Sequence, residues 1–470
     1  QHIVIDTDDG DTPDSADSHF NRGNTLDDLK RHDEAVASYR KALAIDPDFA
    51  EALCNLGGTL NELKRHEEAV ASCEKALALR PDFAEAHNNL GSALNGLKHH
   101  AQAIASCEKA LALRPDFAEA HFNLGIALDG MRHHEEAIAS YRRAIALRPH
   151  FAEAHNSLGN TLNNLGRHRE AIESCEQALA LKPDFAEAHG NLGLILTALN
   201  RHEEAIASYQ RTLALKPDFA EAHCNLGLTL YALKRHEDAI VCYRHALALK
   251  PDFVEAYNNL GGTLGALRRY AEASENYQRA LALNPDLTES LGSLVHARQH
   301  LCEWRQLSTD IAALHEREAQ GKSGKIPPFI YLALPETHFQ EQYQSARQFA
   351  DGQYQTFLSR PLLCGTELRA DPPKLRIGYL SADFHEHATS YLLAEIIERL
   401  DRRSFEVIGY SHGPDDASPM RRRMRAAFDT FRDVAPLSHE DTARQILDDQ
   451  IDILVDLKGY TEYNRLPILA

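Results

Sequence analysis

Titratable side chains gather in two short segments near the end of the sequence, SADFHEHATSY and DLKGYT. Their candidate residues are Asp383, His385, His387, Asp456 and Tyr460. An imidazole, with a reference pKa of about 6.5, can accept a proton or orient a hydroxyl group near neutral pH. A carboxylate can act as a base or hold a loop by hydrogen bonds. For each residue the alternative is a purely structural role in its loop.

Three apolar segments are expected to form the strands that position these residues. They are LRIGYLS (375–381), FEVIGYS (405–411) and DILVDL (452–457), with helical patterns near 389–402, 418–429 and 438–450. This β-α-β-α-β order predicts a parallel sheet with right-handed crossovers. Ligands of such sheets bind at the carboxyl ends of the strands, where the loops 381–391, 411–419 and 458–465 begin. The basic run RRRMR (421–425) falls on a predicted helix, and we expect a solvated face there instead of a phosphate site.

More than half of the chain is a repeat with a fixed period of 34 residues. Its marker is a proline followed by Asp-Phe or a close variant, at Pro47, Pro81, Pro115, Pro149, Pro183, Pro217, Pro251 and Pro285. A period of 34 is typical of tetratricopeptide arrays, in which each unit is a pair of helices. Stacked units form a right-handed superhelix with a long groove that binds other molecules. We therefore expect binding in this half and chemistry beyond it.

The repeat positions, numbered so that this proline is position 32, explain the helix pairs. Position 8 is always Gly and position 20 always Ala, so helices A and B can approach closely. Pro at position 32 ends helix B because it has no N–H and clashes with the preceding turn. The Asp that follows it, with Glu three residues later, predicts a variant capping box for the next helix A, as in Asp82 and Glu85.

An asparagine ladder is the candidate binding feature of the array. Position 6 is Asn in every repeat except the fifth, which has Ser157: Asn21, Asn55, Asn89, Asn123, Asn191, Asn225 and Asn259. An Asn amide carries two donors and an acceptor. A row of them along helix A can hold the backbone of an extended peptide or substrate protein without reading its side chains. The alternative is that this Asn belongs only to the repeat consensus.

Cysteine and histidine are numerous but follow the repeat, which argues against a metal site. Cys73, Cys107 and Cys175 occupy position 24, which holds Tyr in the other repeats. A Cys that alternates with Tyr fills core space. Histidine recurs at positions 4 and 17, where half-buried packing is the expected role. No Cys-x-x-Cys pair occurs, so we predict no metal and a reducing, cytoplasmic compartment.

The charge balance limits the classes of partner that the chain is expected to bind. Lys and Arg total 50 against 69 Asp and Glu, a net charge of −19, which argues against nonspecific binding to nucleic acid or an anionic membrane. No apolar run is long enough to span a bilayer. The first 15 residues are acidic and lack the pattern of a secretory signal, and we expect them to be disordered. Because the sequence does not begin with Met, we expect it to start inside a longer protein.

The segments SADFHEHATSYLL, FEVIGYSHGPDD and ILVDLKGYTEYNRL, together with CEWRQL and IPPFIYLALP before them, resemble the protein O-linked N-acetylglucosamine transferase family. That family joins tetratricopeptide repeats to a two-lobed glycosyltransferase of the GT-B type. The resemblance implies an all-α tetratricopeptide superhelix followed by a partial Rossmann-like α/β lobe. The expected domains are a disordered terminus (1–15), eight repeats (16–287), capping helices and a linker (288–373) and a truncated first lobe (374–470).

The activity that the resemblance implies is inverting transfer of N-acetylglucosamine from UDP-GlcNAc to Ser or Thr of proteins, without a further cofactor. His387 matches the family's active-site histidine, and His385 stands where relatives have a small residue. Asp383 is expected to fix its loop through backbone hydrogen bonds. Asp456 and Tyr460 lie in the Asp-Leu-x-Gly-Tyr-Thr motif, and because many bacterial relatives have His in place of Tyr460, a role as base is doubtful there.

The family's UDP-sugar site lies mainly in a second lobe, which does not occur in these 470 residues. We therefore expect the fragment itself to be inactive, although the parent protein would be a transferase. Two alternatives stay open: a non-catalytic tetratricopeptide scaffold for protein-protein interaction, and the same fold with another sugar donor.

Overall fold

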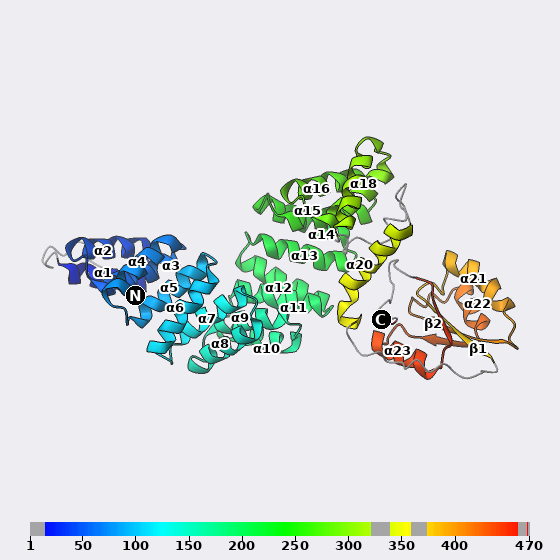
Figure 1. Ribbon diagram of the computed structural model, residues 1–470, viewed down its shortest axis with the longest axis horizontal. Coiled ribbons are helices and arrows are strands. Elements are labelled where there is room, and N and C mark those ends of the chain that lie inside the picture. Colours follow the sequence, from blue (N-terminus) through cyan, green and yellow to red (C-terminus); the bar gives the residue numbers. More distant parts are fainter. Residues whose placement is uncertain (1–14, 321–338, 359–373, 459–467, 469–470) are drawn as a thin grey trace. The chain divides into compact units, whose positions relative to one another are not determined.

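The computed structural model describes residues 15–320, 339–358, 374–458 and 468 (Figure 1). They belong to two compact units, which divide between Ala256 and Tyr257. The predicted disordered terminus and the linker segments 321–338 and 359–373 fall largely outside the described residues.

The first unit is built from alternating A and B helices (Figure 1). They are α1 (Ala16–Asp28), α2 (His32–Ile45), α3 (Ala50–Glu62), α4 (His66–Leu79), α5 (Ala84–Gly96), α6 (His100–Leu113), α7 (Ala118–Gly130), α8 (His134–Leu147), α9 (Ala152–Asn164), α10 (His168–Leu181), α11 (Ala186–Ala198), α12 (His202–Leu215), α13 (Ala220–Ala232), α14 (His236–Leu249) and the first turn of α15 (Val254–Ala266). Each helix packs on its partner and on the next repeat.

Close approach within each pair depends on the glycine at position 8. A Cβ added to Gly91 would lie 2.5 Å from Cys107 Sγ, and one added to Gly23 would lie 2.5 Å from Tyr39 Cε1. The position-24 side chain therefore fills the space that glycine leaves. Cys107 is completely buried, so the prediction that these cysteines act as core residues is confirmed.

Helix A ends in a Schellman motif at position 15. In the second repeat Lys64 N–H donates to Asn61 O and Arg65 N–H to Leu60 O, both at 2.9 Å. Position 15 has a left-handed φ between 58° and 72° throughout, yet it is glycine only at Gly166. This geometry satisfies the last carbonyls of helix A and turns the chain into helix B.

The predicted capping box is wrong. Each helix A from α3 onward in this unit has Phe as its N-cap, without a side-chain capping bond. Glu85, its expected glutamate, instead pairs with Arg114 at 2.6 Å, and Lys250 pairs with Glu221 at 3.1 Å in the same way. Where Arg or Lys precedes the proline, it pairs with the glutamate of helix A, which therefore does not cap the backbone amide of that helix.

The repeat histidines have structural partners. At position 4, Nε2 lies within hydrogen-bond distance of the preceding proline carbonyl, 2.9 Å for His87 and 3.0 Å for His121. At position 17, Nδ1 contacts the position-12 side chain in the first five repeats, as in His32 and Asp27 at 2.8 Å. Nδ1 of His202 and His236 is buried without a hydrogen-bond partner among the described residues. In the described part of the chain no three His, Cys, Asp or Glu side chains come together in a group that can hold a metal ion.

The second unit continues with helices and ends in a sheet (Figure 1). Its helices are the rest of α15, then α16 (Tyr270–Leu283), α17 (Thr288–Leu301), α18 (Trp304–Ala319) and α20 (Phe339–Leu358). Arg298 of α17 is 4% exposed and pairs with Asp310 of α18. Leu291, Val295 and Leu314 form the small core between these two helices.

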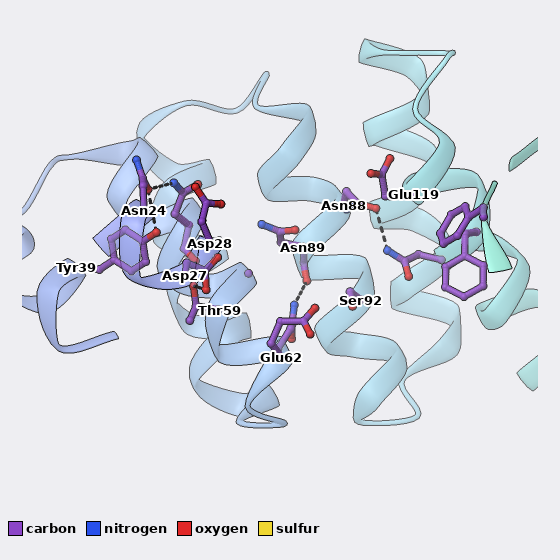
Figure 2. Close-up of a pocket in the computed structure, with 16 residues that line it drawn as sticks. Asn24, Asp27, Asp28, Tyr39, Thr59, Glu62, Asn88, Asn89, Ser92 and Glu119 are labelled. Atoms are coloured by element: carbon purple, nitrogen blue, oxygen red, sulfur yellow. Dashed lines mark hydrogen bonds between the residues drawn. The ribbon is translucent and has the colours of Figure 1, made fainter. Parts of the chain in front are cut away.

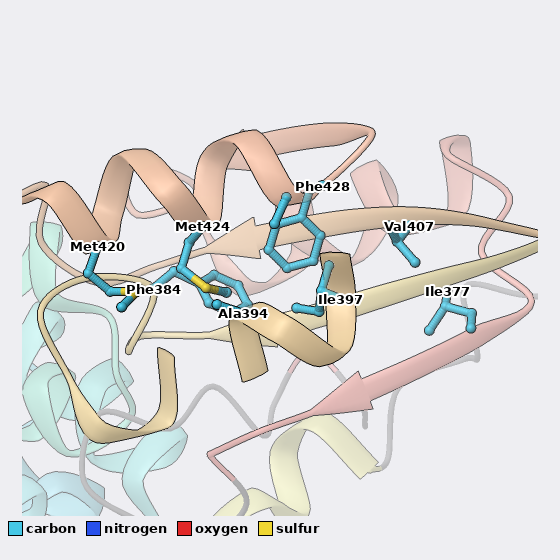
Figure 3. Close-up of a cluster of buried hydrophobic side chains, with 9 residues drawn as sticks. Ile377, Phe384, Ala394, Ile397, Val407, Met420, Met424 and Phe428 are labelled. Atoms are coloured by element: carbon cyan, nitrogen blue, oxygen red, sulfur yellow. The ribbon is translucent and has the colours of Figure 1, made fainter. Parts of the chain in front are cut away.

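The sheet is parallel, in the order β3-β2-β1-β4. Its strands are β1 (Leu375–Ser381), β2 (Phe405–Ser411), β3 (Thr430–Asp433) and β4 (Ile453–Asp456), and its helices are α21 (Ala388–Arg399), α22 (Pro419–Ala427) and α23 (His439–Asp448). The predicted parallel sheet is confirmed, with β3 as an additional strand. Ile397, Met424 and Phe428 pack on one face of the sheet with Val407 (Figure 3).

The RRRMR run is only partly a solvated face. Arg421 is 3% exposed. Its Nη1 donates to Phe384 O at 3.0 Å and to Ser411 Oγ at 2.5 Å. Asp415 and Asp433 lie within 3.8 Å of its guanidinium. Arg421 therefore joins the carboxyl ends of β1 and β2, and the expectation of a fully solvated run is wrong at this residue.

Candidate functional site

The strand order places a topological switch point between β1 and β4. From β1 the chain builds outward through β2 and β3, then returns to the other side of β1 as β4. At such a point neighbouring loops leave the sheet in opposite directions and open a crevice for ligands. The two loops here are those that carry Asp383 and Lys458.

A buried ion pair lies at this switch point. Lys458 Nζ lies 3.1 and 3.2 Å from the two carboxylate oxygens of Asp383, and each side chain is 10% exposed. Thr389 Oγ1 donates to Asp383 Oδ2 at 3.4 Å. The Asp383 side chain thus contacts a lysine and a hydroxyl. The Asp383 backbone holds the loop, because its N–H donates to Ser381 Oγ and its carbonyl oxygen accepts the N–H of His385 at 2.8 Å and the hydroxyl of Ser390.

His387 is the N-cap of α21. Its Nδ1 accepts the N–H of Thr389 at 3.2 Å and lies 3.7 Å from Asp383 Oδ2. A ring nitrogen that accepts a backbone N–H carries a lone pair, so neutral His387 holds its proton on Nε2. The ring is 44% exposed. In this tautomer His387 can donate a hydrogen bond through Nε2 but cannot take up a proton there.

His385 faces a different carboxylate. Its Nδ1 lies 3.8 Å from Asp416 Oδ2, and the same carboxylate accepts the N–H of Glu386 at 2.9 Å. That backbone hydrogen bond is the main cause that lowers the pKa of Asp416 to about 2. Asp416 therefore stays charged and ties the β2 loop to the loop after β1.

The structure brings Asp383 and His387 together, whereas Asp456 contacts the backbone of the chain after β4. Asp456 Oδ1 accepts the N–H of Lys458 at 3.1 Å, which turns the chain after β4. Tyr460 lies outside the described residues. Lys458 and Thr389 were not predicted as site residues. The available signal was that Lys458 directly follows a strand end, as the other candidates do.

The second candidate is a groove along the A helices of the first repeats (Figure 2). It encloses about 600 Å³. Residues at positions 5, 6, 9, 10, 12 and 13 of the A helices line it, together with Tyr39, Glu119 and Phe151. The helix A residues are Phe122, Asn88, Asn55, Asn89, Asn123, Asn24, Gly58, Ser92, Thr59, Asp27, Asn61, Asp28 and Glu62. Amide and carboxylate groups from successive repeats thus share one surface.

Four ladder asparagines, three of them in this groove, also bond between repeats. Asn55 Nδ2 donates to Asn24 Oδ1 at 2.8 Å, Asn123 to Asn88 at 2.9 Å and Asn191 to Asn156 at 2.9 Å. Asn89 donates to the backbone carbonyl of Cys54 at 3.2 Å. Each of these amides therefore donates one N–H to the neighbouring repeat, and an Asn side chain carries a second N–H and an acceptor oxygen.

The remaining ladder members differ in exposure. Asn21 is exposed, and Asn225 and Asn259 are half-buried. Their backbone carbonyls accept the hydroxyl groups of Thr25, Thr229 and Thr263. Four ladder amides thus serve the contact between repeats, and the role of the ladder towards a peptide stays a prediction.

Comparison with known proteins agrees with both halves of this description. Tetratricopeptide repeat profiles match residues 16–49, 50–83, 220–253 and 254–287, and related profiles match 82–150, 122–184 and 193–234. Residues 352–470 match glycosyl transferase family 41. The chain thus joins tetratricopeptide repeats to a region that is similar to glycosyl transferase family 41. The resemblance seen in the sequence motifs is thereby confirmed at the level of the family.

Two curated relatives each match about a fifth of the chain. One is the probable UDP-N-acetylglucosamine–peptide N-acetylglucosaminyltransferase SEC of Arabidopsis thaliana, 36% identical over 21% of this chain and 10% of the relative. The other is the UDP-N-acetylglucosamine–peptide N-acetylglucosaminyltransferase of Caenorhabditis elegans, 35% identical over 21% of this chain and 8% of the relative. The chain thus spans a small part of these relatives.

Among solved structures, the chain resembles the APC/C hetero-tetramer Cut9–Hcn1 with a TM-score of 0.51 and 20% identity, over 60% of this chain and 56% of that one. This likeness concerns the fold alone, and it supports the predicted helical superhelix. None of the helices described has the length and apolar character needed to span a bilayer.

Proposed function

We propose that the protein transfers N-acetylglucosamine from UDP-GlcNAc to Ser or Thr hydroxyls of proteins. The observation that carries this proposal is the match of residues 352–470 to family 41, on a sheet whose switch point holds Asp383 and His387. The names of the two relatives describe the same type of transfer. We further propose a GT-B arrangement and a cytoplasmic location, in line with the free, buried thiols of the repeats.

The reaction sets clear demands on the site. In an inverting transfer the hydroxyl oxygen bonds to the anomeric carbon, the bond to the diphosphate oxygen breaks on the opposite face, and the hydroxyl proton leaves. Groups that hold the acceptor and stabilise the leaving charge therefore supply most of the acceleration.

His387 suits an orienting role in this scheme. Because its Nδ1 is engaged as an N-cap acceptor, its Nε2–H is the group available to substrate. A proton-accepting role would require the other tautomer and would remove the cap from α21. We therefore assign His387 to donate a hydrogen bond that positions a substrate oxygen, with Asp383 and Lys458 fixing the loop beneath it.

The repeats then serve as the substrate-binding part. The second amide donor and the oxygen of each ladder Asn are suited to the backbone of an extended polypeptide. The groove of about 600 Å³ offers room for such a segment.

A pair of substitutions at His387 tests the assignment in the complete gene product. His387→Ala removes both the cap and the Nε2 donor, and we expect transfer to fall by more than tenfold, about 1.4 kcal/mol of barrier. His387→Asn keeps an N-cap acceptor and an amide donor, so it should retain clearly more activity than the Ala variant. Transfer by His387→Ala within tenfold of wild type would refute the role. A complete protein that binds polypeptides but never turns over the donor would indicate the scaffold alternative.

A further inference from the structure

The inner face of the array changes character along its length, and this inference rests on the proposed role of the groove in binding polypeptide. Positions 9, 12 and 13 of helix A line the groove in the first repeats. In α1 they are Asn24, Asp27 and Asp28, and in α3 they include Asn61 and Glu62. The amino-terminal end of the groove is therefore polar and acidic (Figure 2).

Two of these carboxylates have no cationic partner. Asp27 contacts His32, and Glu119 pairs with Arg148. Asp28 and Glu62 are exposed and make no ion pair with any residue that the structure describes. Uncompensated negative charge in a concave surface attracts cations, because the hollow focuses the field.

The fifth repeat is neutral at the same three positions, with Asn160, Asn163 and Asn164. These amide side chains lie between the acidic first repeats and the sixth and seventh repeats. Ile126, at position 9 of the fourth repeat, does not interrupt it with an exposed apolar group, because it packs on the core beside Tyr141.

The sixth and seventh repeats are apolar at these positions, except for Thr197 at position 12 of the sixth. Leu194 and Leu228 at position 9 are 37% and 44% exposed, and Tyr231 at position 12 is 37% exposed. Position 13 is an exposed alanine in both repeats, at Ala198 and Ala232. Neighbouring repeats thus present one apolar surface where the first repeats present carboxylates.

This apolar surface differs from the other exposed apolar side chains of the array. Leucine at position 30 is exposed in repeat after repeat, as at Leu79, Leu113 and Leu249, and belongs to the repeat itself. Leu194, Leu228 and Tyr231 break the repeat pattern on the inner face. Contiguous exposed apolar groups of this kind mark interaction sites.

We propose that the groove binds an extended polypeptide segment with lysine or arginine at one end and aliphatic residues at the other. The basic end lies against Asp28 and Glu62, the aliphatic end against Leu194, Leu228 and Tyr231, and the asparagines between them hold the backbone. The ladder gives general affinity, while the two ends select the segment and fix its direction. Charge complementarity supports the first contact, and burial of exposed apolar surface supports the second.

The test uses labelled synthetic peptides and the full chain in fluorescence anisotropy. One peptide joins a lysine block to a leucine block through a Ser/Asn spacer. Others replace the lysines by glutamates or by serines, or replace the leucines by serines. The two-block peptide should bind most tightly and the glutamate peptide most weakly. Higher salt should weaken the lysine peptides alone, because exposed ion pairs are screened.

Matched variants locate the two contacts. Asp28→Asn with Glu62→Gln should weaken the two-block peptide about threefold to tenfold and leave the serine-for-lysine peptide unchanged. Leu194→Ser with Leu228→Ser should weaken only peptides with the leucine block. The controls are Glu67→Gln, which removes an exposed carboxylate on a B helix, and Leu79→Ser, which removes an exposed repeat leucine. Circular dichroism verifies that all variants fold.

Each outcome has one meaning. If the groove variants bind no differently from their controls, or glutamate peptides bind as well as lysine peptides, the inference is wrong while general polypeptide binding stands. If no peptide of any composition binds, the polypeptide-binding part of the proposed function fails together with it.

Discussion

The ion pair between Asp383 and Lys458 gives a quantitative prediction for the candidate site. In Lys458→Met the Asp383 carboxylate stays at 10% exposure without its cation. Loss of one member of a buried pair costs about 3–5 kcal/mol. The Thr389 hydroxyl bond to Asp383 remains, so we expect the lower value, about 3 kcal/mol. Asp383→Asn with Lys458→Met removes both charges, and it should recover most of this loss.

Native-state hydrogen exchange of the peptide segment around β1 measures this free energy locally. A cost of about 3 kcal/mol raises the population of the open form about 150-fold, because 1.36 kcal/mol is one decade. The matched control is Arg444→Met, which removes the exposed partner of Glu440 on α23 and should cost no more than about 0.5 kcal/mol. Two results would refute the reasoning. One is equal exchange rates in Lys458→Met and Arg444→Met, and the other is a double variant that exchanges as fast as Lys458→Met.

Four further predictions follow from the packing. Gly91→Ala should destabilise the array by about 1–3 kcal/mol in thermal unfolding, because its Cβ would lie 2.5 Å from Cys107 Sγ; Ala93→Gly, which adds no atom, is not expected to produce that steric conflict. Lys64→Gly should stabilise by about 0.5–1 kcal/mol, because Lys64 has a φ of 58°, and Gly166→Lys should have the opposite effect. Burial raises the pKa of Cys107 and Cys175 to about 12, whereas a thiol in the unfolded chain has a pKa of about 8.5. Because the unfolded chain loses these protons first, the free energy of unfolding should fall as pH rises from about 9 toward 12. Cys107→Ala should make this fall smaller. Gly413→Ala should open the β1–β2 edge, since its Cβ would overlap the carbonyl oxygen of Ala382; faster hydrogen exchange in both strands measures this, and unchanged exchange would contradict it.

The repeat could be predicted from the sequence because its period determines which residues meet. Gly at position 8 opposite Cys or Tyr at position 24 is visible in the printed chain, and the contact follows from helix geometry alone. The capping box failed because Glu85 had a stronger alternative partner in Arg114, which lies 29 residues further on. Such competition between partners is decided by the packed repeat and not by local spacing.

The candidate site was predicted in part for a similar reason. The pattern of buried strands indicated which loops would meet, and His387 lies at the predicted edge. The contact of Lys458 with Asp383 depends on β4 pairing with β1, which the order of elements alone does not determine. The strand β3 was missed because TFRD is short and half polar, and Arg421 was misjudged because a buried guanidinium needs the carbonyl of Phe384 and the hydroxyl of Ser411 as partners.

The central claim is protein glycosylation directed by the repeats, and one transfer assay tests it most directly. The complete gene product is incubated with radiolabelled UDP-GlcNAc and a peptide that carries lysines, leucines and a single serine. We predict label on this peptide, none on its alanine counterpart, and a loss of more than tenfold in His387→Ala. Tight binding of the peptide without any transfer of label would contradict the claim.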